Sequence, residues 1–249
     1  MRGILLAGGT GSRLFPLTKC INKHLLPIGG KPMAQWNIEK FVEAGIKEIL
    51  IVSGQEQCGS IIQQFGDGSE LGCDITYKVQ SKAGGIAQAL NLAKDFTRDE
   101  PMCVILGDNI FDMSLKGIPQ TFKDGATIFL KRVSDPQRYG VAEFNRKMSM
   151  NNNQVSIISI EEKPKNPKTD YAVTGIYCYD RKVFDIISTI KPSARGELEI
   201  TDVNNEYVRR NEMTAYIMND NEFWSDAGTF NSYAFVNEYK NYKEKFIEN

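Results

Sequence analysis

The residues of this chain best suited to chemistry form a glycine-rich segment near its start, followed by two cations. Gly8, Gly9 and Gly11 come directly after an apolar run, and Arg13 and Lys23 follow them. Glycine permits backbone turns with positive φ, and such turns can aim several N–H groups at one anion. Two cationic side chains would add charge to that cradle. The segment therefore predicts a loop that binds a triphosphate.

Two better-known phosphate-binding loops are excluded by the spacing. A P-loop requires a Lys-Ser or Lys-Thr pair directly after its last glycine, whereas Arg13 follows Ser12 here and Pro16 interrupts any immediate helix. The dinucleotide-binding motif requires a third glycine where this chain has Leu14. A tight surface loop is the ordinary explanation of clustered glycines. The two cations favour phosphate binding over that explanation.

Two aspartates in strand-to-turn settings are the candidates for a metal site. Asp108 follows the apolar run 104–106 and Gly107, and Asp226 lies in the sequence Trp-Ser-Asp-Ala-Gly-Thr. Hard carboxylate oxygens suit Mg²⁺, which usually takes one or two protein carboxylates together with phosphates and waters. Each aspartate alone fits a turn or a helix cap equally well. Spacing by itself leaves both roles open.

The elements that would position these residues alternate over the first half of the chain. Apolar runs predict strands at 4–7, 48–53, 75–79 and 102–106, and helical patterns predict helices at 33–44, 60–65 and 86–94. Pro32 is expected at the first position of the first helix and Gly45 just past its end. This order predicts a mainly parallel sheet covered on both faces. Ligands then bind at the carboxyl ends of the strands, where Gly8 and Asp108 both fall.

The pattern changes after Gly125. Further strands are expected at 126–133, 141–144, 156–161 and 172–179, which we interpret as a substrate-binding insertion continuous with the sheet. The three asparagines 151–153 are expected to form an exposed hairpin tip without a function. At the end, aromatic and aliphatic residues at spacings of three and four predict an amphipathic helix that packs on its own domain: Phe230, Tyr233, Val236, Tyr239, Tyr242 and Phe246.

Composition limits the class of protein. The 249 residues, 41% of them apolar, suffice for one α/β domain, and we expect a single domain over 1–249. A net charge of −1 disfavours an extended nucleic-acid interface. No apolar stretch approaches the length of a membrane span or a signal peptide. Five cysteines without a C-x-x-C pair indicate reduced thiols, so we expect a cytoplasmic protein that contacts neither nucleic acid nor membrane.

Taken together, the motifs resemble those of the sugar-1-phosphate nucleotidyltransferases, and within them the thymidylyltransferases that act on glucose 1-phosphate. The resemblance rests on motifs in the family's order along nearly the whole chain: 8–18, 23–27, 31–33, Gln80, 85–89, 106–109, 139–141, 161–164, 173–175, 195–202 and 224–229. It implies a Rossmann-like three-layer α/β/α nucleotidyltransferase fold with a mixed, mainly parallel central sheet and a sugar-binding insertion.

Within that fold, the nucleotide-binding part would span about 1–125, and the sugar-binding part and C-terminal helix about 126–249.

The resemblance also implies the residues that bind the nucleotide. Arg13 and Lys23 would orient the triphosphate, and Gln80 and Gly85 would read the edge of the pyrimidine. The full nucleotide-binding set is Leu6, Gly8, Gly9, Gly11, Ser12, Arg13, Lys23, Gln80, Gly85 and Asp108. His24 stands where many thymidylyltransferases have glutamine. With no partner placed for a triad or a metal pair, we expect it to pack or to hydrogen-bond near the base.

On the sugar side, the resemblance implies that Lys163 receives the sugar phosphate. The expected sugar-phosphate set is Tyr139, Gly140, Glu161, Lys163, Val173, Thr174 and Arg195. For Arg195 two roles stay open, a phosphate contact and an organising contact with Glu197 or Glu199. Asp108 and Asp226 would hold Mg²⁺ as the cofactor, so the expected catalytic residues are Arg13, Lys23, Asp108, Lys163 and Asp226.

Together with these residues, the resemblance implies Mg²⁺-dependent transfer of a nucleotidyl group from dTTP to glucose 1-phosphate, giving dTDP-glucose and pyrophosphate. The sugar phosphate is already an anionic nucleophile, so the task is electrostatic and needs no general base. UTP in place of dTTP is the alternative within the same chemistry, and a silent module that binds a nucleotide sugar is the alternative outside it. The family suggests a role in a rhamnose-type deoxysugar pathway for polysaccharides and leaves a homo-oligomer open.

Overall fold

The computed structural model describes residues 1–145 and 154–247, which divide between two compact units. The first unit contains the described residues of 2–83, 105–119 and 223–247, and the second those of 1, 84–104 and 120–222. The expected division near residue 125 follows chain order, whereas the observed units interleave. Segment 84–104 belongs with the second unit, and the C-terminal helix belongs with the first.

The first unit is built on parallel strands in the order β5-β4-β1. Leu5 lies opposite Ile51, which lies opposite Tyr77. Most of β1 and β4 is buried, as their unbroken apolar runs require. The bounds are β1 (Arg2–Ala7), β4 (Glu48–Gly54) and β5 (Asp74–Gln80), while β6 (Met102–Leu106) has only its last two residues in this unit. The predicted strands are confirmed.

Helix α1 (Met33–Glu43) presents residues at helical spacing to the core. Pro32 directly precedes this helix and is not its first residue, because its backbone is extended with ψ near 140°. Gly45 follows the end of the helix with φ of 80°, as predicted. Helix α2 (Cys58–Phe65) also begins near its expected position, and a short hairpin joins β2 (Pro27–Ile28) to β3 (Lys31–Pro32).

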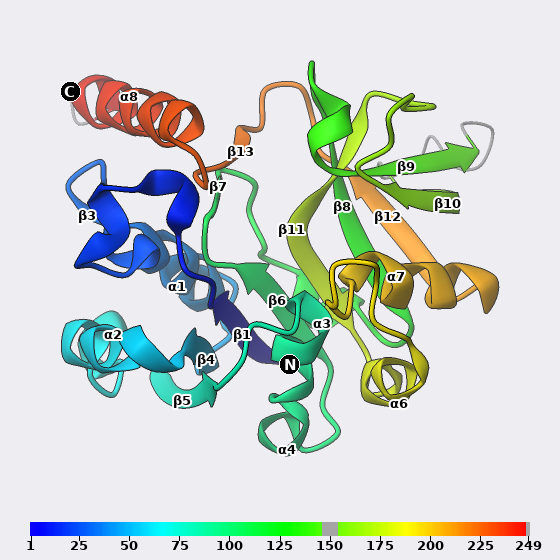
Figure 1. The fold of residues 1–249 in the computed structure, drawn as a ribbon, viewed down its shortest axis with the longest axis horizontal. Coiled ribbons are helices and arrows are strands. Elements are labelled where there is room, and N and C mark those ends of the chain that lie inside the picture. The colour runs from blue at the N-terminus through cyan, green and yellow to red at the C-terminus, as the bar shows by residue number, and fades with distance from the viewer. Residues whose placement is uncertain (146–153, 248–249) are drawn as a thin grey trace. The chain divides into compact units, whose positions relative to one another are not determined.

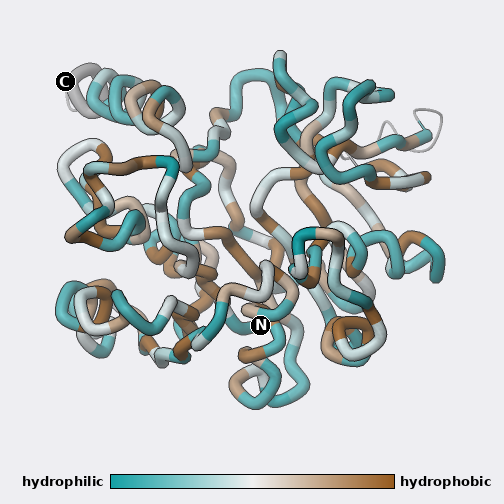
Figure 2. Tube along the Cα trace, viewed as in Figure 1, coloured by the Kyte–Doolittle hydropathy of each residue, from teal (hydrophilic) through white to brown (hydrophobic). Residues whose placement is uncertain are grey.

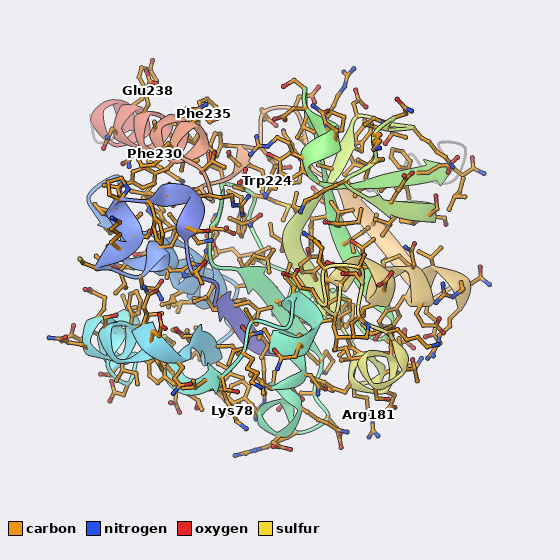
Figure 3. The ribbon with its side chains drawn as sticks, in the orientation of Figure 1. Lys78, Arg181, Trp224, Phe230, Phe235 and Glu238 are labelled. Atoms are coloured by element: carbon orange, nitrogen blue, oxygen red, sulfur yellow. The ribbon has the colours of Figure 1, made fainter. Side chains whose placement is uncertain are left out.

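A second two-stranded ribbon in the first unit pairs β7 (Asn109–Phe111) with β13 (Trp224–Asp226) in antiparallel fashion (Figure 1). The chain continues into α8 (Phe230–Ile247), which contacts β2. Of the aromatic and aliphatic stripe predicted for this helix, Val236 is fully buried, but Phe230 and Tyr242 are 43% and 63% exposed. In Figure 3, Glu238 points outward from α8.

The second unit is a mixed sheet in the order β11-β8-β12-β10-β9. Only β8 and β12 are parallel, whereas the pairs β11–β8, β12–β10 and β10–β9 are antiparallel. The mainly parallel arrangement therefore describes the first unit and not this one. The bounds are β8 (Ala126–Arg132), β9 (Gly140–Asn145), β10 (Gln154–Glu162), β11 (Tyr171–Tyr179) and β12 (Met213–Ile217).

Helices of the second unit cover part of this sheet. The helix predicted at 86–94 is interrupted at Leu92 and Ala93, and its remainder begins a separate turn. Figure 2 shows hydrophobic and hydrophilic residues alternating along α6, whose apolar residues are buried. The bounds are α3 (Ile86–Asn91), α4 (Lys94–Thr97), α6 (Lys182–Thr189) and α7 (Ile200–Arg209), while α5 (Ile118–Thr121) has residues in both units.

Two further expectations concern the asparagine tip and membrane-spanning helices. The asparagine tip predicted at 151–153 lies outside the described residues. In the described segments, 1–145 and 154–247, no helix combines the length and the apolar character needed to cross a bilayer.

Candidate active site

The glycine loop of the first unit has the backbone that phosphate binding requires. Gly9 and Gly11 adopt φ of 92° and 64°, values that other residues rarely adopt. The Gly11 carbonyl accepts hydrogen bonds from Leu14 N–H at 2.9 Å and from the Thr18 hydroxyl at 2.7 Å. Thr18 is 2% exposed. This threonine, to which the sequence analysis gave no role, therefore fixes the shape of the loop.

Lys23 forms an ion pair with Asp108, which lies just past the carboxyl end of β6. The Lys23 ammonium donates to Asp108 Oδ2 at 2.6 Å, and both side chains are largely buried. Burial raises the pKa of Asp108. The charge of Lys23 and the hydrogen bonds from Lys23 and Asn109 outweigh that effect and hold the pKa well below its usual range. Asp108 is therefore an anion at neutral pH.

His24 is a packing residue beside this pair, as the sequence analysis expected. Its Nδ1 lies 2.8 Å from Asn22 Oδ1, which can only accept, so Nδ1 carries the proton. Burial and the neighbouring Lys23 charge lower the pKa of His24 to about 3, despite the opposing effect of Asp108. A Cβ at Gly107 would lie 2.6 Å from the imidazole Cδ2. The neutral ring thus packs directly against Gly107.

The β7–β13 ribbon brings the second aspartate to the first. Asp226 pairs with Asn109, and the Ala227 N–H donates to the Asp108 carbonyl at 2.7 Å. Trp224, labelled in Figure 3, donates its indole N–H to Asn109 Oδ1 at 2.8 Å. The tryptophan of the Trp-Ser-Asp motif therefore holds the ribbon in register while the aspartate reaches the site.

The two carboxylates converge at Gly228. A Cβ at this glycine would lie 3.2 Å from Asp108 Oδ2, 3.2 Å from Asp226 Oδ2 and 3.5 Å from Arg13 Nη2. The glycine thus leaves open a small space bounded by two carboxylates and a guanidinium. The structure brings together four of the five expected catalytic residues in this way, since Lys23 is bonded to Asp108.

This donor set fits a magnesium ion. Two carboxylates are the usual protein contribution when phosphates and waters complete the coordination shell. The described residues contain no cluster of three or more histidine, cysteine, aspartate or glutamate side chains that would suit a transition metal or a closed structural site. The space at Gly228 is the place where both carboxylates could reach one ion.

A cavity of about 480 Å³ lies beside the glycine loop, within the first unit. Gln80, predicted to read the base, lines it and is held against Gly8, whose added Cβ would lie 2.8 Å from Gln80 Oε1. The cavity is lined by Gly9, Thr10, Phe15, Thr18, Lys19, Gly54, Gln55, Glu56, Gln57, Gln80, Ser81 and Ala83. The segment 54–57 and Lys19 carried no signal in the sequence that assigned them to this site.

Other predicted nucleotide-binding residues have structural roles. Leu6 is 6% exposed, and its carbonyl accepts from Gly107 N–H at 2.9 Å. Gly85 belongs to the second unit and adopts φ of 95°, and a Cβ there would lie 2.5 Å from the Leu198 carbonyl. The Leu198 N–H also donates to the Gly84 carbonyl at 2.8 Å. The 195–202 motif therefore supports the glycine segment 84–85.

Four residues of the second unit gather around the end of β10. The Lys163 N–H donates to the Tyr139 carbonyl at 3.0 Å, and Glu162 pairs with Gly140 across the strands. Lys163 Nζ lies 3.5 Å from Glu162 Oε1. Lys163 also adopts φ of 46°, which is uncommon for a residue with a side chain. Three predicted residues, Tyr139, Gly140 and Lys163, are thus brought together.

Glu162, which the sequence analysis did not assign, is the carboxylate of this group. Its Oε2 accepts from the Thr201 hydroxyl at 2.7 Å and lies beside Gly140. Neighbouring residues on a strand point to opposite faces, so the predicted Glu161 points away from Glu162. Only the register of β10 distinguishes these adjacent glutamates.

Two further predictions take a different form in the structure. Thr174 has no exposed surface, and its hydroxyl donates to the Phe129 carbonyl at 2.9 Å, so it offers a ligand no hydroxyl. Val173 lies where the β11–β8 register shifts, a common feature near binding sites. Arg195 lies among three carboxylates and donates to Glu199 at 2.9 Å, the arrangement expected of an organising residue.

A family comparison places this geometry among known proteins. The family model described as "Nucleotidyl transferase" matches residues 2–242. The chain belongs to the nucleotidyl transferase family. The α/β fold is therefore that of a nucleotidyltransferase, and the family resemblance inferred from the motifs is confirmed.

Individual relatives narrow the comparison. A glucose-1-phosphate thymidylyltransferase from Neisseria meningitidis is 41% identical over 238 residues, which cover 93% of this chain and 80% of the relative. A crystal structure with sucrose, of a Bacillus anthracis protein assigned as a glucose-1-phosphate thymidylyltransferase, is 49% identical with a TM-score of 0.89 and covers 97% of this chain and 95% of that one. A UDP-glucose pyrophosphorylase bound to UDP-glucose has a TM-score of 0.86 at 25% identity and covers 98% of each chain.

Proposed function

We propose that this nucleotidyltransferase is a glucose-1-phosphate thymidylyltransferase, which converts dTTP and glucose 1-phosphate to dTDP-glucose and pyrophosphate. The observation that carries the proposal is the convergence of Asp108 and Asp226 on the space at Gly228, beside Arg13. The relatives support the choice of dTTP over UTP. The thymidylyltransferase from Neisseria meningitidis is 41% identical to this chain, whereas the UDP-glucose pyrophosphorylase is 25% identical.

The first unit would bind the triphosphate through its loop and its cations. The N–H groups of the turn at Gly9–Gly11 and the charges of Arg13 and Lys23 would neutralise the phosphates as two anions approach each other. In the structure the Lys23 ammonium donates a hydrogen bond to Asp108. We expect the ammonium to pass to a phosphate oxygen when the nucleotide binds, which leaves Asp108 Oδ2 free for a cation.

Asp108 and Asp226 would hold Mg²⁺. When bound, the ion supplies positive charge to the phosphates of the nucleotide and to the departing pyrophosphate. The low pKa of Asp108 keeps this ligand ionised across the physiological range. No residue need act as a base, because the phosphate of glucose 1-phosphate is already an anion and attacks the α-phosphorus in line. The neutral, buried His24 accords with that chemistry.

The second unit would bind the sugar phosphate. Lys163 would pair with its phosphate, and Glu162 together with the backbone of Gly140 and Val173 would receive the hydroxyl groups of the hexose. Glu162 is already oriented by Thr201. Arg195 would act through Glu199 and Glu162 and not by direct contact, since it is engaged by their carboxylates.

A cytoplasmic location and the supply of dTDP-glucose to a rhamnose-type deoxysugar pathway complete the proposal. All five cysteines are free thiols, as expected in a reducing compartment. Assembly into a homo-oligomer remains a prediction that light scattering on the purified chain can check.

The metal assignment is tested by Asp108→Asn and Asp226→Asn, with Asp112→Asn as a matched control. Asp112 is also a carboxylate paired with lysine, but it lies at the other end of the β7 segment and binds α8. Pyrophosphate release from dTTP and glucose 1-phosphate should fall by a factor of about 10³ or more in the first two variants and by less than about threefold in the control. Full activity of Asp108→Asn with Mg²⁺ would refute the assignment.

A further inference from the structure

Asn37 is a buried amide whose presence in α1 is not explained by packing. Its side chain is 1% exposed on the face of the helix that also buries Ala34, Ile38 and Phe41. Its Nδ2 donates to the Gly107 carbonyl at 3.2 Å, while its Oδ1 is buried without a hydrogen-bond partner. A leucine would fill a similar volume and would remove this unpaired oxygen, but it would leave the buried Gly107 carbonyl without the Asn37 donor.

An unpaired buried oxygen destabilises a folded protein, so its retention indicates another use. Among the residues that the structure describes, only one other side-chain atom is buried in this way, Glu212 Oε2. The Glu212 side chain is 33% exposed and its other oxygen pairs with Lys182 at 2.8 Å, whereas Asn37 is 1% exposed. Asn37 makes one hydrogen bond, and its recipient is the peptide that precedes Asp108.

Gly107 is held from three directions. Its N–H donates to the Leu6 carbonyl at 2.9 Å, its carbonyl accepts from Asn37, and the His24 ring lies against its Cα. The Asn37 bond is the one that fixes the carbonyl and hence the plane of the peptide that leads into Asp108. A side chain one bond beyond a fixed peptide has fewer directions available to it, which preorganises it for a ligand.

We infer that Asn37 is a positioning residue that orients Asp108 for the metal ion by holding the Gly107 carbonyl. The inference rests on the proposed function, because it assumes that Asp108 binds the ion. It assigns to α1 a role that no motif in the sequence indicated. Loss of the amide should weaken metal binding while the packing of the helix survives.

The test replaces Asn37 by leucine in the full-length protein, with Asn204→Leu as a matched control. Asn204 is also 1% exposed on a helix, α7, and its Oδ1 accepts a buried hydrogen bond from the Tyr179 hydroxyl, but it lies in the second unit. Binding of Mn²⁺ to the protein without substrates is followed by electron paramagnetic resonance, and the Mg²⁺ concentration that gives half-maximal activity is measured separately. Thermal melting reports the stability of each variant.

Asn37→Leu should bind Mn²⁺ roughly tenfold more weakly and should require correspondingly more Mg²⁺, with a fall in melting temperature no larger than that of Asn204→Leu. Asn204→Leu should lower the melting temperature and leave both metal constants unchanged. Asn37→Ala, which adds no bulk, serves in case leucine does not fold. Wild-type Mn²⁺ and Mg²⁺ constants in a folded Asn37 variant would overturn the inference.

Asp108→Asn distinguishes failure of the inference from failure of the metal assignment. If this variant loses Mn²⁺ binding while the Asn37 variants keep it, the metal assignment stands and the inference falls. If Asp108→Asn binds Mn²⁺ as the wild type does, both fall together.

Discussion

At the scale of single residues, Lys163 combines an uncommon backbone with a proposed contact to the sugar phosphate. Its φ of 46° lies in a region that disfavours every residue with a Cβ, and roughly half of its side chain is exposed. Neither packing nor a strong ion pair accounts for a lysine there, since its nearest carboxylate oxygen lies 3.5 Å away. Such strain is typical of functional positions, where a side chain is needed in spite of the backbone.

Lys163→Gly should therefore separate stability from activity. We expect the free energy of unfolding to stay the same or rise by up to about 1 kcal/mol, because glycine adopts positive φ without strain. At the same time kcat/KM for glucose 1-phosphate should fall by a factor of about 100, since a charge-assisted phosphate contact is lost. Urea unfolding and initial rates measure the two effects. A variant that is less stable and fully active would contradict this account of Lys163.

A second prediction concerns Gly228, which leaves room for an ion between two carboxylates. In Gly228→Ala the new methyl group would meet Asp108 Oδ2 and Asp226 Oδ2 at 3.2 Å, so we expect about a tenfold or larger rise in the Mg²⁺ concentration needed for half-maximal activity. Gly59→Ala is the control, since a Cβ there meets no atom within 4 Å and alanine favours its helix. An unchanged Mg²⁺ requirement in Gly228→Ala would show that the ion does not bind at this point.

At the scale of elements, one carboxylate makes several of the polar contacts of the C-terminal helix, beside those of Tyr233 and Asn237 with the β2–β3 hairpin. Asp112 accepts hydrogen bonds from Lys240 at 2.8 Å, from Lys243 at 2.5 Å and from the Tyr239 hydroxyl. The ring of Tyr239 also stacks on Phe223 at 3.7 Å between centroids. These polar contacts explain why a helix with two exposed aromatic residues in its predicted apolar stripe is still docked. Asp112 immediately follows β7, so the same segment supports α8 and the aspartates of the site.

The attachment of α8 should weaken in acid. Burial raises the pKa of Asp112, but the hydrogen bonds from Lys240, Lys243 and Tyr239 outweigh burial and lower it to about 2. An unfolded aspartate has a pKa near 3.9, so the stabilisation is fully present above that value and is lost as the pH falls toward 2. Asp112→Asn should lower the free energy of unfolding by about 1–2 kcal/mol at pH 7.

Denaturant unfolding at a series of pH values measures this contribution. The difference in stability between wild type and Asp112→Asn should be constant above about pH 5 and shrink between about pH 5 and 2. A difference that is unchanged over this range would mean that the carboxylate charge does not hold the helix.

At the scale of the whole molecule, the sequence predicted the parts that depend on local pattern. Uninterrupted apolar runs located β1, β4 and β6, because strands buried on both faces leave that mark, whereas β5 is exposed at several positions. The glycine loop was also located from a local pattern, three clustered glycines followed by two cations. Sequence alone could not distinguish Glu161 from its neighbour Glu162, because register across strands determines which of two adjacent residues faces a given side of the sheet.

Other features were beyond prediction because they depend on contacts between distant segments. Thr18 and Asn37 act through one hydrogen bond each to a backbone carbonyl, at Gly11 and at Gly107, which leaves no periodicity in the sequence. The interleaving of the two units follows from where the chain crosses between them, and the short strands β7 and β13 carry too few residues to show a pattern.

Release of pyrophosphate in the presence of Mg²⁺ and glucose 1-phosphate decides whether the protein is a thymidylyltransferase. The nucleotides dTTP, UTP, CTP, ATP and GTP are offered separately, and each sugar nucleotide formed is identified. We expect rapid turnover with dTTP, a clear preference for dTTP over UTP, and dTDP-glucose as the product. A preference for UTP would transfer the protein to the uridylyl branch of the family. Absence of turnover with all five nucleotides, under conditions in which the protein is folded, would contradict the proposed thymidylyltransferase activity.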